Sequence, residues 1–448
     1  MKTIKILANK SVEHVSNIGC VNFTECMSLR QKFILFFLEY NNKIKKSSPA
    51  WIALLNYLRK NNLVRTIIYR IRRHTNFFFR HNDLIYKLHF KNDWFTHNKN
   101  YHKSSVVKEP NNLLGLFRHK YQEKFICTSS DLYTKKNIRL IMGLGTINHY
   151  ETGEFFSIFG DPRDVVSHDE SLVNMRTLLS GKFDSMFKKN KKVFLKEAIV
   201  LSTSLSKNYM HWMTDFLPRI LLFYNDKNHI HIPLLVGSWL HKNQIESITA
   251  YNPSIIIKRI DEFVGVQVEN FYYVSPPSFM PYNFRVNSKK QKFLVSFSEG
   301  FFKNFTSYFL DLKKNNSYDK IYVARDSSVR NISNEVLLIE KLKQLGFKII
   351  RPTKISFKEQ VSIFSSARII VSCGGAALAN IIFCNKNAII GILASDCPDH
   401  GFCLFSRLAY VSSRCKIFFM LGSKATSIHQ DFKVDIDSVE SDLKKWCS

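Results

Sequence analysis

The chain has 448 residues, of which 45% are hydrophobic and 23% are charged, and its formal net charge at pH 7 is +29. This length is too great for one simple core, so we expect two or three domains of ordinary soluble composition. The charge favours an anionic partner: a lipid surface, a nucleic acid or a phosphorylated substrate.

The nine cysteines include no C-x-x-C pair, which argues against a disulfide framework or a zinc ribbon and for a reducing compartment. The first residues, "MKTIKILANKSVEHV", contain no long apolar region typical of a secretory signal. No window approaches the roughly 18 apolar residues that a membrane-spanning helix needs. We therefore expect a cytoplasmic protein.

Residues 1–125 are predicted to form a basic, partly helical N-terminal extension. Residues 1–120 hold 22 Lys and Arg against six Asp and Glu, a net charge of +16. Within them, 51–73 has the apolar spacing of an amphipathic helix, and 51–80 contains seven basic residues and no acidic one. Such a helix can lie on an anionic membrane surface, or it can dock its apolar face on the body of the protein.

Residues 126–285 are predicted to form an N-terminal α/β domain. Short strands are expected at "IRLIMGLG", "EFFSIFG" and "KEAIVLST". A helix is expected at 208–220, followed by a strand at 232–237, a helix near 239–250 and strands at "SIIIKRI" and "NFYYVS". This alternation indicates a parallel α/β layer. The three prolines of 275–284 predict a linker, and a long helix is expected to start near Lys289.

Residues 286–448 are predicted to form a Rossmann-like domain. Strands are expected at "KIYVAR", "FKIIR", "RIIVS" and "AIIGIL", alternating with helices at 333–345, 356–366 and 376–384. This β-α-β-α-β-α-β order is typical of a doubly wound half. Two such layers joined by a proline-rich linker predict a two-domain protein with a cleft between the domains.

"RIIVSCGGAALAN" (368–380) is the strongest local motif, because an apolar strand ends in Gly374-Gly375 and a helix of small residues follows at once. Glycines let a ligand approach the backbone, and a helix N-terminus favours an anion. The alternative is a tight strand-to-helix turn. The motif is neither G-x-G-x-x-G nor a Walker A loop, so a nicotinamide cofactor or a P-loop is not indicated.

"ARDSSVRNISNE" (324–335) follows the first strand of the same domain. Arg325 and Arg330 flank its polar loop, and two guanidiniums at the carboxyl edge of a sheet suit a diphosphate. The alternative is a pair of solvated loop charges. Both motifs should open on the same sheet edge, which favours a shared anion site.

"NYMHWMTDFLPRI" (208–220) carries His211, Asp215 and Arg219 at intervals of four, so they share one helix face. Asp215 could orient the His211 imidazole as a base, and Arg219 could hold an anionic substrate group. The alternative is an exposed row of charges. Pro218 is expected to kink or end the helix nearby.

Two metal-like motifs are expected to be structural. The D-x-D of "VDIDS" (434–438) precedes "VESDLKKW", so we expect a strand and a helix cap rather than a metal site. His229-x-His231 has no further ligand near it in the sequence, and zinc is not expected.

Together these segments resemble glycosyltransferase family 61, particularly its bacterial members linked to polysaccharide synthesis. The family's N-Y-x-H-W block, acidic residue and L-P-R-L correspond to Asn208 through Ile220. Its strand-Arg, second Arg and N-E pair correspond to 325–335, its F-x-E-Q helix to 357–360, and its H-G-A-G-L-x-N block to 374–380. The resemblance covers about 195–395. It departs from the family at Gly374, where His is frequent, and at Asp215, where Glu is common.

The resemblance implies a GT-B-like α/β fold, with two Rossmann-like domains facing a cleft and a basic helical N-terminal extension. It implies inverting transfer of a hexose or pentose from a nucleotide sugar to a glycan or lipid-linked saccharide in surface polysaccharide synthesis. His211 or Asp215 would be the base, and Asn208, Trp212 and Arg219 would bind the acceptor. The implied donor site consists of Arg325, Arg330, Asn334, Glu335, Glu359, Gln360, Gly374, Gly375, Ala376, Leu378 and Asn380.

No essential metal or cofactor is expected beside the nucleotide sugar. The inner face of the cytoplasmic membrane is a candidate surface for the protein. Two alternatives remain open. One is an inactive relative acting as a scaffold in polysaccharide assembly, for which Gly374 is the argument. The other is a basic nucleic-acid-binding protein, although no recognisable nucleic-acid module is present and nucleic acid is not the expected partner.

Overall fold

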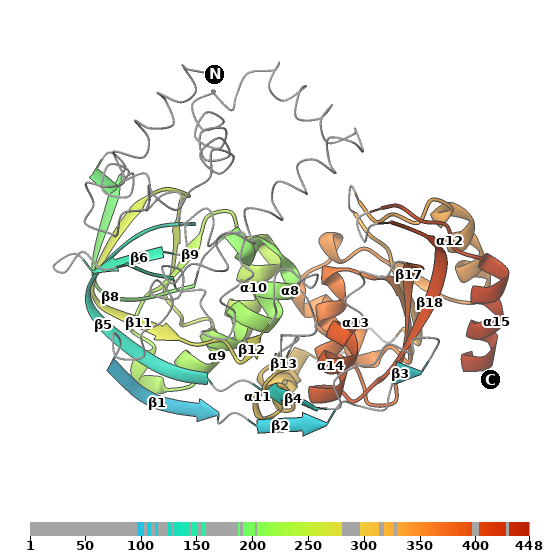
Figure 1. Cartoon of the computed structure of the whole chain (residues 1–448), viewed down its shortest axis with the longest axis horizontal. Helices are drawn as coiled ribbons and strands as arrows, with labels where there is room; N and C mark the ends of the chain where they lie inside the picture. Colours follow the sequence, from blue (N-terminus) through green and yellow to red (C-terminus); the bar gives the residue numbers. More distant parts are fainter. Residues whose placement is uncertain are drawn as a thin grey trace, which may run out of the picture.

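A computed structural model of the chain consists of two α/β halves (Figure 1). It describes residues 130–143, 191–201, 204–279, 296–312, 318–326, 329–396, 403–426 and 430–447, and the short segments 96–102, 105–108, 113–114, 124–127, 146–149, 155–157 and 187–188. The predicted helix at 51–73 lies outside the described residues. In the part of the chain that the structure describes, no helix is both long and apolar enough to cross a membrane.

The first sheet is mixed. Its strand order is β10 (Ile257–Ile260), β9 (Leu234–Gly237), β8 (Lys192–Val200), β11 (Gly265–Val274), β5 (Ser130–Ile141), β6 (Thr146–His149) and β7 (Phe155–Ser157). The first four strands are parallel, as predicted, whereas β5, β6 and β7 form antiparallel pairs. The chain order reverses between β8 and β11, and ligands of open α/β sheets gather at such a point beyond the carboxyl ends of the strands.

The predicted helix at 208–220 is a composite of α-helical and π-helical segments. After the 3-10 helix η2 (Ser204–Lys207), the chain forms α8 (Tyr209–His211), a π-helical turn η3 (Trp212–Phe216) and α9 (Leu217–Tyr224). Pro218 does not end the helix, because it lies in the first turn of α9, where a missing N–H is tolerated. The departure from α geometry lies just before it, and such π turns are frequent at functional sites.

The helices that follow complete the first half. The 3-10 helix η4 (Lys227–His229) precedes β9, and α10 (Lys242–Tyr251) lies between β9 and β10. Helix α10 corresponds to the helix predicted near 239–250. Together with α8, it is a helix of this half that contacts the second half (Figure 1).

The second sheet is wholly parallel. Its order is β15 (Lys348–Ile350), β14 (Lys320–Val323), β16 (Ile369–Cys373), β17 (Ile389–Asp396), β18 (Lys416–Lys424) and β3 (Leu113–Leu114). The predicted alternation of strands and helices is confirmed by α12 (Glu335–Gln344), η6 (Pro352–Lys354), α13 (Phe357–Ser366) and η7 (Ala376–Phe383). The last two helices of the half are α14 (Cys403–Val411) and α15 (Ile436–Cys447). The helix predicted at 376–384 is 3-10 rather than α. Here the chain order reverses between β14 and β16.

The connection between the halves contains shorter helices than predicted. Strand β12 (Ser278–Phe279), inside the predicted linker, pairs with β13 (Ser296–Phe297), and residues 280–295 lie outside the described part. Where they resume, the residues form α11 (Glu299–Phe302) and the 3-10 segment η5 (Phe305–Leu312), which is interrupted at Phe309. The expected long helix from Lys289 is therefore not continuous through this stretch.

Part of the predicted N-terminal extension belongs to the two sheets. β1 (Thr96–His102) pairs with β5 of the first sheet, whereas β3 pairs with β18 at the edge of the second. Between and after them, β2 (Ser105–Lys108) and β4 (Lys124–Cys127) form their own antiparallel pair. These strands are short, and several lie at sheet edges, where a regular apolar alternation is not required. This explains why the pattern did not predict them.

An aromatic cluster joins the two halves. Rings of η5, α13 and η7 contact one another, with Phe309 5.3 Å from Phe357 and Phe305 5.8 Å from Phe383 between ring centroids. Tyr308 of η5 also lies 5.6 Å from Tyr251 at the end of α10. One contiguous core therefore includes buried apolar residues of both sheets, while the other face of the second sheet packs in a separate cluster with α12 and α15.

Candidate active site

His211 and Asp215 form a close pair at the carboxyl edge of the first sheet. The His211 Nδ1 atom lies 2.6 Å from Asp215 Oδ2, and 11% of the imidazole and 18% of the carboxylate side chain are exposed. The pair spans the start of the π turn, next to the point where the sheet order reverses. With Nδ1 engaged by Asp215, Nε2 is the ring nitrogen left to face a ligand, since none of the described residues is bonded to it.

Both oxygens of the Asp215 carboxylate are occupied. Oδ2 faces His211, and Oδ1 accepts hydrogen bonds from Ser278 Oγ and from Thr214 Oγ1 at 3.1 Å. Burial alone would raise the pKa of Asp215, but these hydrogen bonds and the charges of His211 and Arg219 lower it below its ordinary value. Asp215 is therefore an ionised carboxylate that orients the imidazole.

Arg219 continues the row but is buried, with 3% exposure. Its guanidinium lies over the rings of Phe216 and Tyr273, at 5.7 and 5.3 Å from their centroids. Its Nε has no hydrogen-bond partner in the described part of the chain. Arg219 therefore contributes positive charge behind Asp215, and the row is not an exposed face.

The other predicted acceptor residues have local contacts. The Asn208 side chain caps α8 by accepting a hydrogen bond from the Met210 N–H at 2.9 Å. Trp212 is fully buried, stacks on Phe216 and donates its Nε1–H to Ser247 at 3.0 Å. The structure thus places Trp212 in the core beneath the His211–Asp215 pair.

Arg325 and Arg330 lie at the carboxyl edge of the second sheet, beside the point where its order reverses. Arg325 donates from Nη1 to the Gly374 carbonyl at 2.5 Å, which joins the end of β14 to the end of β16. Burial and the charge of Arg325 lower the pKa of Arg330. The Arg330 backbone has a positive φ of 60°, a strained conformation often found at functional sites.

The carboxylates near the two arginines accept hydrogen bonds from other residues. Asp326 accepts hydrogen bonds from Arg351 Nη1 at 2.6 Å and Thr353 Oγ1 at 2.5 Å, and Glu335 accepts one from Tyr322 at 2.7 Å. Neither Arg325 nor Arg330 forms an ion pair with any residue of the described ranges. Two unneutralised guanidiniums at one sheet edge suit an anion such as a diphosphate.

The glycine pair fits this site unequally. A Cβ added to Gly375 would lie 2.6 Å from Arg325 Nη1, whereas one added to Gly374 would meet nothing closer than Ile392 Cγ2 at 3.7 Å. Gly375 therefore permits the position of Arg325. The next residues begin η7, where Ala376 is partly exposed and Leu378 is buried in the core.

Asn334 and Glu359 bind the backbone of their own half. The Asn334 amide donates to the Val434 carbonyl at 2.9 Å and accepts from the Val434 N–H at 3.1 Å. Glu359 forms a capping box with Ser356 at the start of α13, accepting from its N–H and Oγ. Both side chains hold structure around the arginine pair.

Gln360 and Asn380 belong to a buried polar chain that crosses between the halves. Tyr209 Oη donates to Asn380 Oδ1 at 2.9 Å, Asn380 Nδ2 to Gln360 Oε1 at 2.9 Å, and Gln360 Nε2 to the Pro352 carbonyl at 3.0 Å. Asn380 and Gln360 are at most 1% exposed, so these amides contact protein. The chain connects the helix that carries His211 to the helix that follows the glycine pair.

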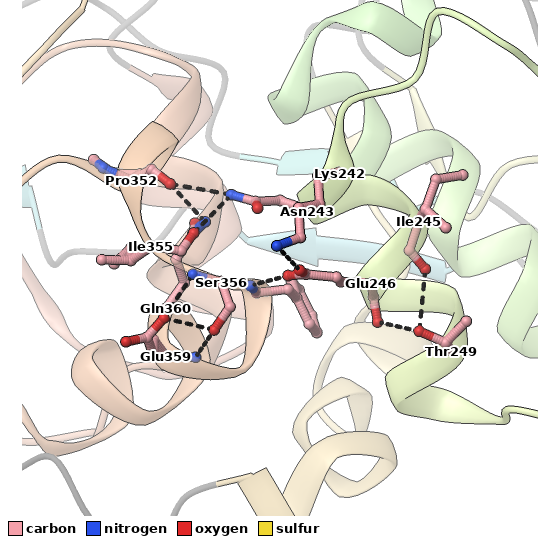
Figure 2. Close-up of polar contacts among 11 residues, drawn as sticks. Lys242, Asn243, Ile245, Glu246, Thr249, Pro352, Ile355, Ser356, Glu359 and Gln360 are labelled. Carbon is pink, nitrogen blue, oxygen red and sulfur yellow. Dashed lines mark hydrogen bonds and ion pairs between the residues drawn. The ribbon is translucent and has the colours of Figure 1, made fainter.

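A second set of contacts joins α10 to the start of α13 (Figure 2). Asn243 Nδ2 donates to the carbonyls of Pro352 and Ile355 at 3.0 and 3.1 Å, and Glu246 Oε2 accepts from the Phe357 N–H at 2.8 Å. A carboxylate of one half thus caps a helix of the other, where the helix dipole favours negative charge. These contacts fix the two sheet edges relative to each other.

The expected metal-like motifs have structural roles. Asp435 caps α15 by accepting from the N–H groups of Asp437 and Ser438. His229 stacks on Phe223 at 4.3 Å, while His231 faces Glu197 at 3.2 Å. Within the described ranges, no group of His, Cys, Asp and Glu is arranged to hold a metal ion.

Three residues of the site were not predicted: Ser278, Thr214 and Tyr209. Ser278 lies in the segment predicted as a linker, 63 residues from Asp215 in the sequence. The signal that could have indicated it is its place just after β11, since the carboxyl end of β11 is adjacent to that of β8. Tyr209 is the tyrosine of the N-Y-x-H-W block but was assigned no role, and Thr214 lies between His211 and Asp215 with no pattern of its own.

The described residues thus place a histidine–carboxylate pair at one sheet edge and two arginines at the edge of the other sheet. The family model described as Glycosyltransferase 61 matches residues 209–391, from Tyr209 to the middle of β17. Residues 209–391 are similar to this family, and the match indicates that the protein is a glycosyltransferase. No curated protein matches the chain.

Proposed function

We propose that the protein is an inverting glycosyltransferase with a GT-B-like arrangement. It transfers a sugar from a nucleotide-sugar donor to a glycan or lipid-linked saccharide acceptor in surface polysaccharide synthesis. The observation that carries the proposal is the His211–Asp215 pair, with Nδ1 and Oδ2 2.6 Å apart, because it supplies a base.

His211 is the base and Asp215 its orienting partner. Nε2 of His211 accepts the proton of the acceptor hydroxyl, while the carboxylate holds the Nδ1–H tautomer and stabilises the imidazolium that forms. Asp215 is the weaker candidate for the base because both of its oxygens already accept hydrogen bonds and its pKa is lowered. These contacts favour His211 over Asp215 as the base.

Arg325 and Arg330 hold the diphosphate of the donor. As the acceptor oxygen forms its bond to the anomeric carbon, the bond from that carbon to the phosphate oxygen breaks. The nucleoside diphosphate then leaves with the electron pair. The two guanidiniums stabilise the charge that develops on it, which makes a metal ion unnecessary. Attack opposite to the leaving group inverts the anomeric configuration.

The protein works in the cytoplasm, on the inner face of the cytoplasmic membrane. The basic segment 51–80 and the +16 charge of residues 1–120 support this location, because a lipid-linked acceptor lies at that surface. Nucleic acid is not the partner. The same basic charge suits an anionic lipid surface.

The test is a donor screen followed by two variants. UDP-, GDP- and CMP-sugars are compared by thermal stabilisation, since a bound ligand raises apparent stability by mass action. With the stabilising donor, His211→Asn should retain binding and lose turnover by roughly 10²–10⁴-fold. Asp215→Asn should also retain binding but lose activity less completely than removal of the base.

Full activity in His211→Asn would contradict the proposed base. Donor binding without any transfer or hydrolysis by the wild-type protein would instead support an inactive scaffold. Stabilisation by nucleic acid and by none of the nucleotide sugars would contradict the proposal as a whole.

A further inference from the structure

The Asp215 carboxylate is oriented by a hydroxyl from outside its own helix. Oδ1 contacts Ser278 Oγ and Thr214 Oγ1, of which Thr214 is the adjacent residue and Ser278 follows β11. Both side chains are at most 2% exposed, so neither hydroxyl contacts bulk water. Oδ1 thus has two candidate hydrogen-bond donors.

Only Ser278 can donate its hydroxyl hydrogen fully to Asp215 Oδ1. A hydroxyl carries a single hydrogen. Thr214 Oγ1 lies 2.8 Å from the Met210 carbonyl and 3.1 Å from Asp215 Oδ1, so its hydrogen belongs mainly to the helix backbone. The one described partner of Ser278 Oγ is Asp215 Oδ1. Ser278 is therefore the dedicated donor to this carboxylate.

The position of Ser278 is fixed by the connection between the halves. Its strand β12 pairs with β13, with Ser278 opposite Phe297. The Ser298 N–H donates to the Pro277 carbonyl at 2.7 Å, one residue from Ser278. The serine hydroxyl consequently approaches Asp215 from a hydrogen-bonded backbone segment outside the helix that carries the pair.

The remaining charges around Asp215 are few. His211 of α8 and Arg219 of α9 act on it electrostatically. Among the other elements packed against the π turn, η7 and β12 carry no charged residue, and Lys207 of η2 pairs with Glu262 at 3.9 Å. Changing Ser278 therefore changes one neutral contact and leaves the charges in place.

We propose that Ser278 is a positioning residue that fixes the Asp215 carboxylate, so that His211 is held with Nδ1 protonated and Nε2 open for the acceptor. The inference rests on the proposed role of His211 as the base. It adds a third side chain to the pair from a segment that no family motif covers.

The direction of the effect follows from the charge of the pair. The working state, with Asp215 ionised and His211 neutral, has a net charge of −1, whereas the protonated pair is neutral overall. The Ser278 hydroxyl dipole stabilises the charged state more than the neutral one. Removing it should therefore move the protonation midpoint of the pair to higher pH.

The experiment compares Ser278→Ala and Ser278→Cys with Ser298→Ala in the full-length chain. Ser298 is a matched control: it has the same 2% exposure and lies in the same hairpin, but it caps α11. The NMR signals of the His211 ring protons are followed from about pH 4 to about pH 9 in steps of about half a pH unit. The signal that disappears in His211→Asn is the one that belongs to His211. Thermal unfolding of each variant is recorded in parallel.

Ser278→Ala should raise the midpoint by about half a unit to one unit. Ser278→Cys, which keeps the packing with a weaker donor, should give a smaller rise in the same direction. Ser298→Ala should lower stability and leave the midpoint unchanged. With UDP-, GDP- or CMP-sugar hydrolysis as the activity probe, Ser278→Ala should lower kcat roughly tenfold with KM unchanged, the equivalent of one charge-assisted hydrogen bond.

An unchanged midpoint in both Ser278 variants would overturn the inference, as would an equal shift in Ser298→Ala. If Ser278→Ala does not fold, the Cys variant decides. The titration does not depend on sugar transfer. A shifted midpoint in a protein that transfers and hydrolyses no sugar would therefore support the role of Ser278 while contradicting the proposed function.

Discussion

Arg325 fills the space beside Gly375, where a Cβ would lie 2.6 Å from the guanidinium Nη1. The φ of Gly375 is −174°, which any residue adopts, so the glycine is required by the approach of Arg325 and not by its backbone. The atom in the way is the far end of a flexible side chain. A larger residue at 375 would therefore displace Arg325 without breaking the fold.

Gly375→Ala should weaken binding of the nucleotide-sugar donor with little loss of stability. Displacing Arg325 removes its hydrogen bond to Gly374 and one charge from the anion site, at a cost of about 1.5–3 kcal/mol in binding. Calorimetric titration and thermal unfolding measure the two effects. Gly374→Ala is the control, because its Cβ would sit at an ordinary 3.7 Å contact. Equal affinity in the two variants would contradict this account.

Arg325→Ala and Arg330→Ala should each weaken nucleotide-sugar binding by about 1.5–3 kcal/mol, the range for charge-assisted hydrogen bonds. Arg351→Ala is a matched control, because its guanidinium is already paired with Asp326. It should change donor affinity less than either. Wild-type affinity in both Arg325→Ala and Arg330→Ala would exclude these residues from the donor site.

Tyr209→Phe should lower the free energy of unfolding by about 1–3 kcal/mol. The substitution leaves the oxygen of Asn380, which is fully buried, without its 2.9 Å hydrogen bond from Tyr209. Urea unfolding measures the loss. Tyr251→Phe removes only a long 3.5 Å contact to the Leu221 carbonyl and should cost about 0.5 kcal/mol or less. If Tyr209→Phe and Tyr251→Phe lower the free energy of unfolding equally, the buried polar chain does not stabilise the junction between the halves.

Asp215 should contribute to stability at neutral pH and lose that contribution in acid. Its pKa in the folded protein is lowered from an unfolded value of about 3.9, so the stabilisation is fully present above that value. It disappears as pH falls through the folded pKa. The difference in unfolding free energy between wild type and Asp215→Asn should shrink as the pH falls below about pH 4. If the difference in unfolding free energy instead grows as the pH falls, the prediction is wrong.

The protein should bind anionic vesicles and not zwitterionic ones, through residues 51–80. Each basic residue close to the surface contributes about 1 kcal/mol, and the attraction fades beyond roughly 8 Å at physiological salt. Vesicle co-sedimentation at low and high salt, with DNA as competitor, measures the effect. Replacing Arg70, Arg72 and Arg73 by Gln keeps the apolar stripe and should reduce binding to anionic vesicles. Indifference to anionic vesicles at low salt would indicate that the segment docks on the protein instead.

The second half could be predicted from sequence because its local signals agree. Ser356 and Glu359 form the capping box that starts α13, and Gly346 has the positive φ that ends the preceding helix. The 3-10 form of η7 could not be predicted, because both helix types accommodate the same run of apolar residues. Edge strands such as β3 depend on a partner far away in the sequence.

The candidate site was predicted in part. The spacing of His211 and Asp215 indicated their contact, but in a π turn only the structure could show that both carboxylate oxygens are engaged. Motif membership did not distinguish side chains that face a ligand from those that hold the site together, and Trp212, Gln360 and Asn380 belong to the buried group. Ser278 could not be found because its proximity arises from the order of the strands.

The aromatic cluster around Phe309, Phe357 and Phe383 has a consequence for engineering. These rings pack η5 against the second half, and Tyr308 of η5 contacts Tyr251 of α10, so separating the halves would expose apolar surface of the shared core on each. Neither half is expected to be soluble when expressed alone. Exchanging the donor half with that of a relative would require η5, α10 and the start of α13 to be transplanted together as one unit of recombination.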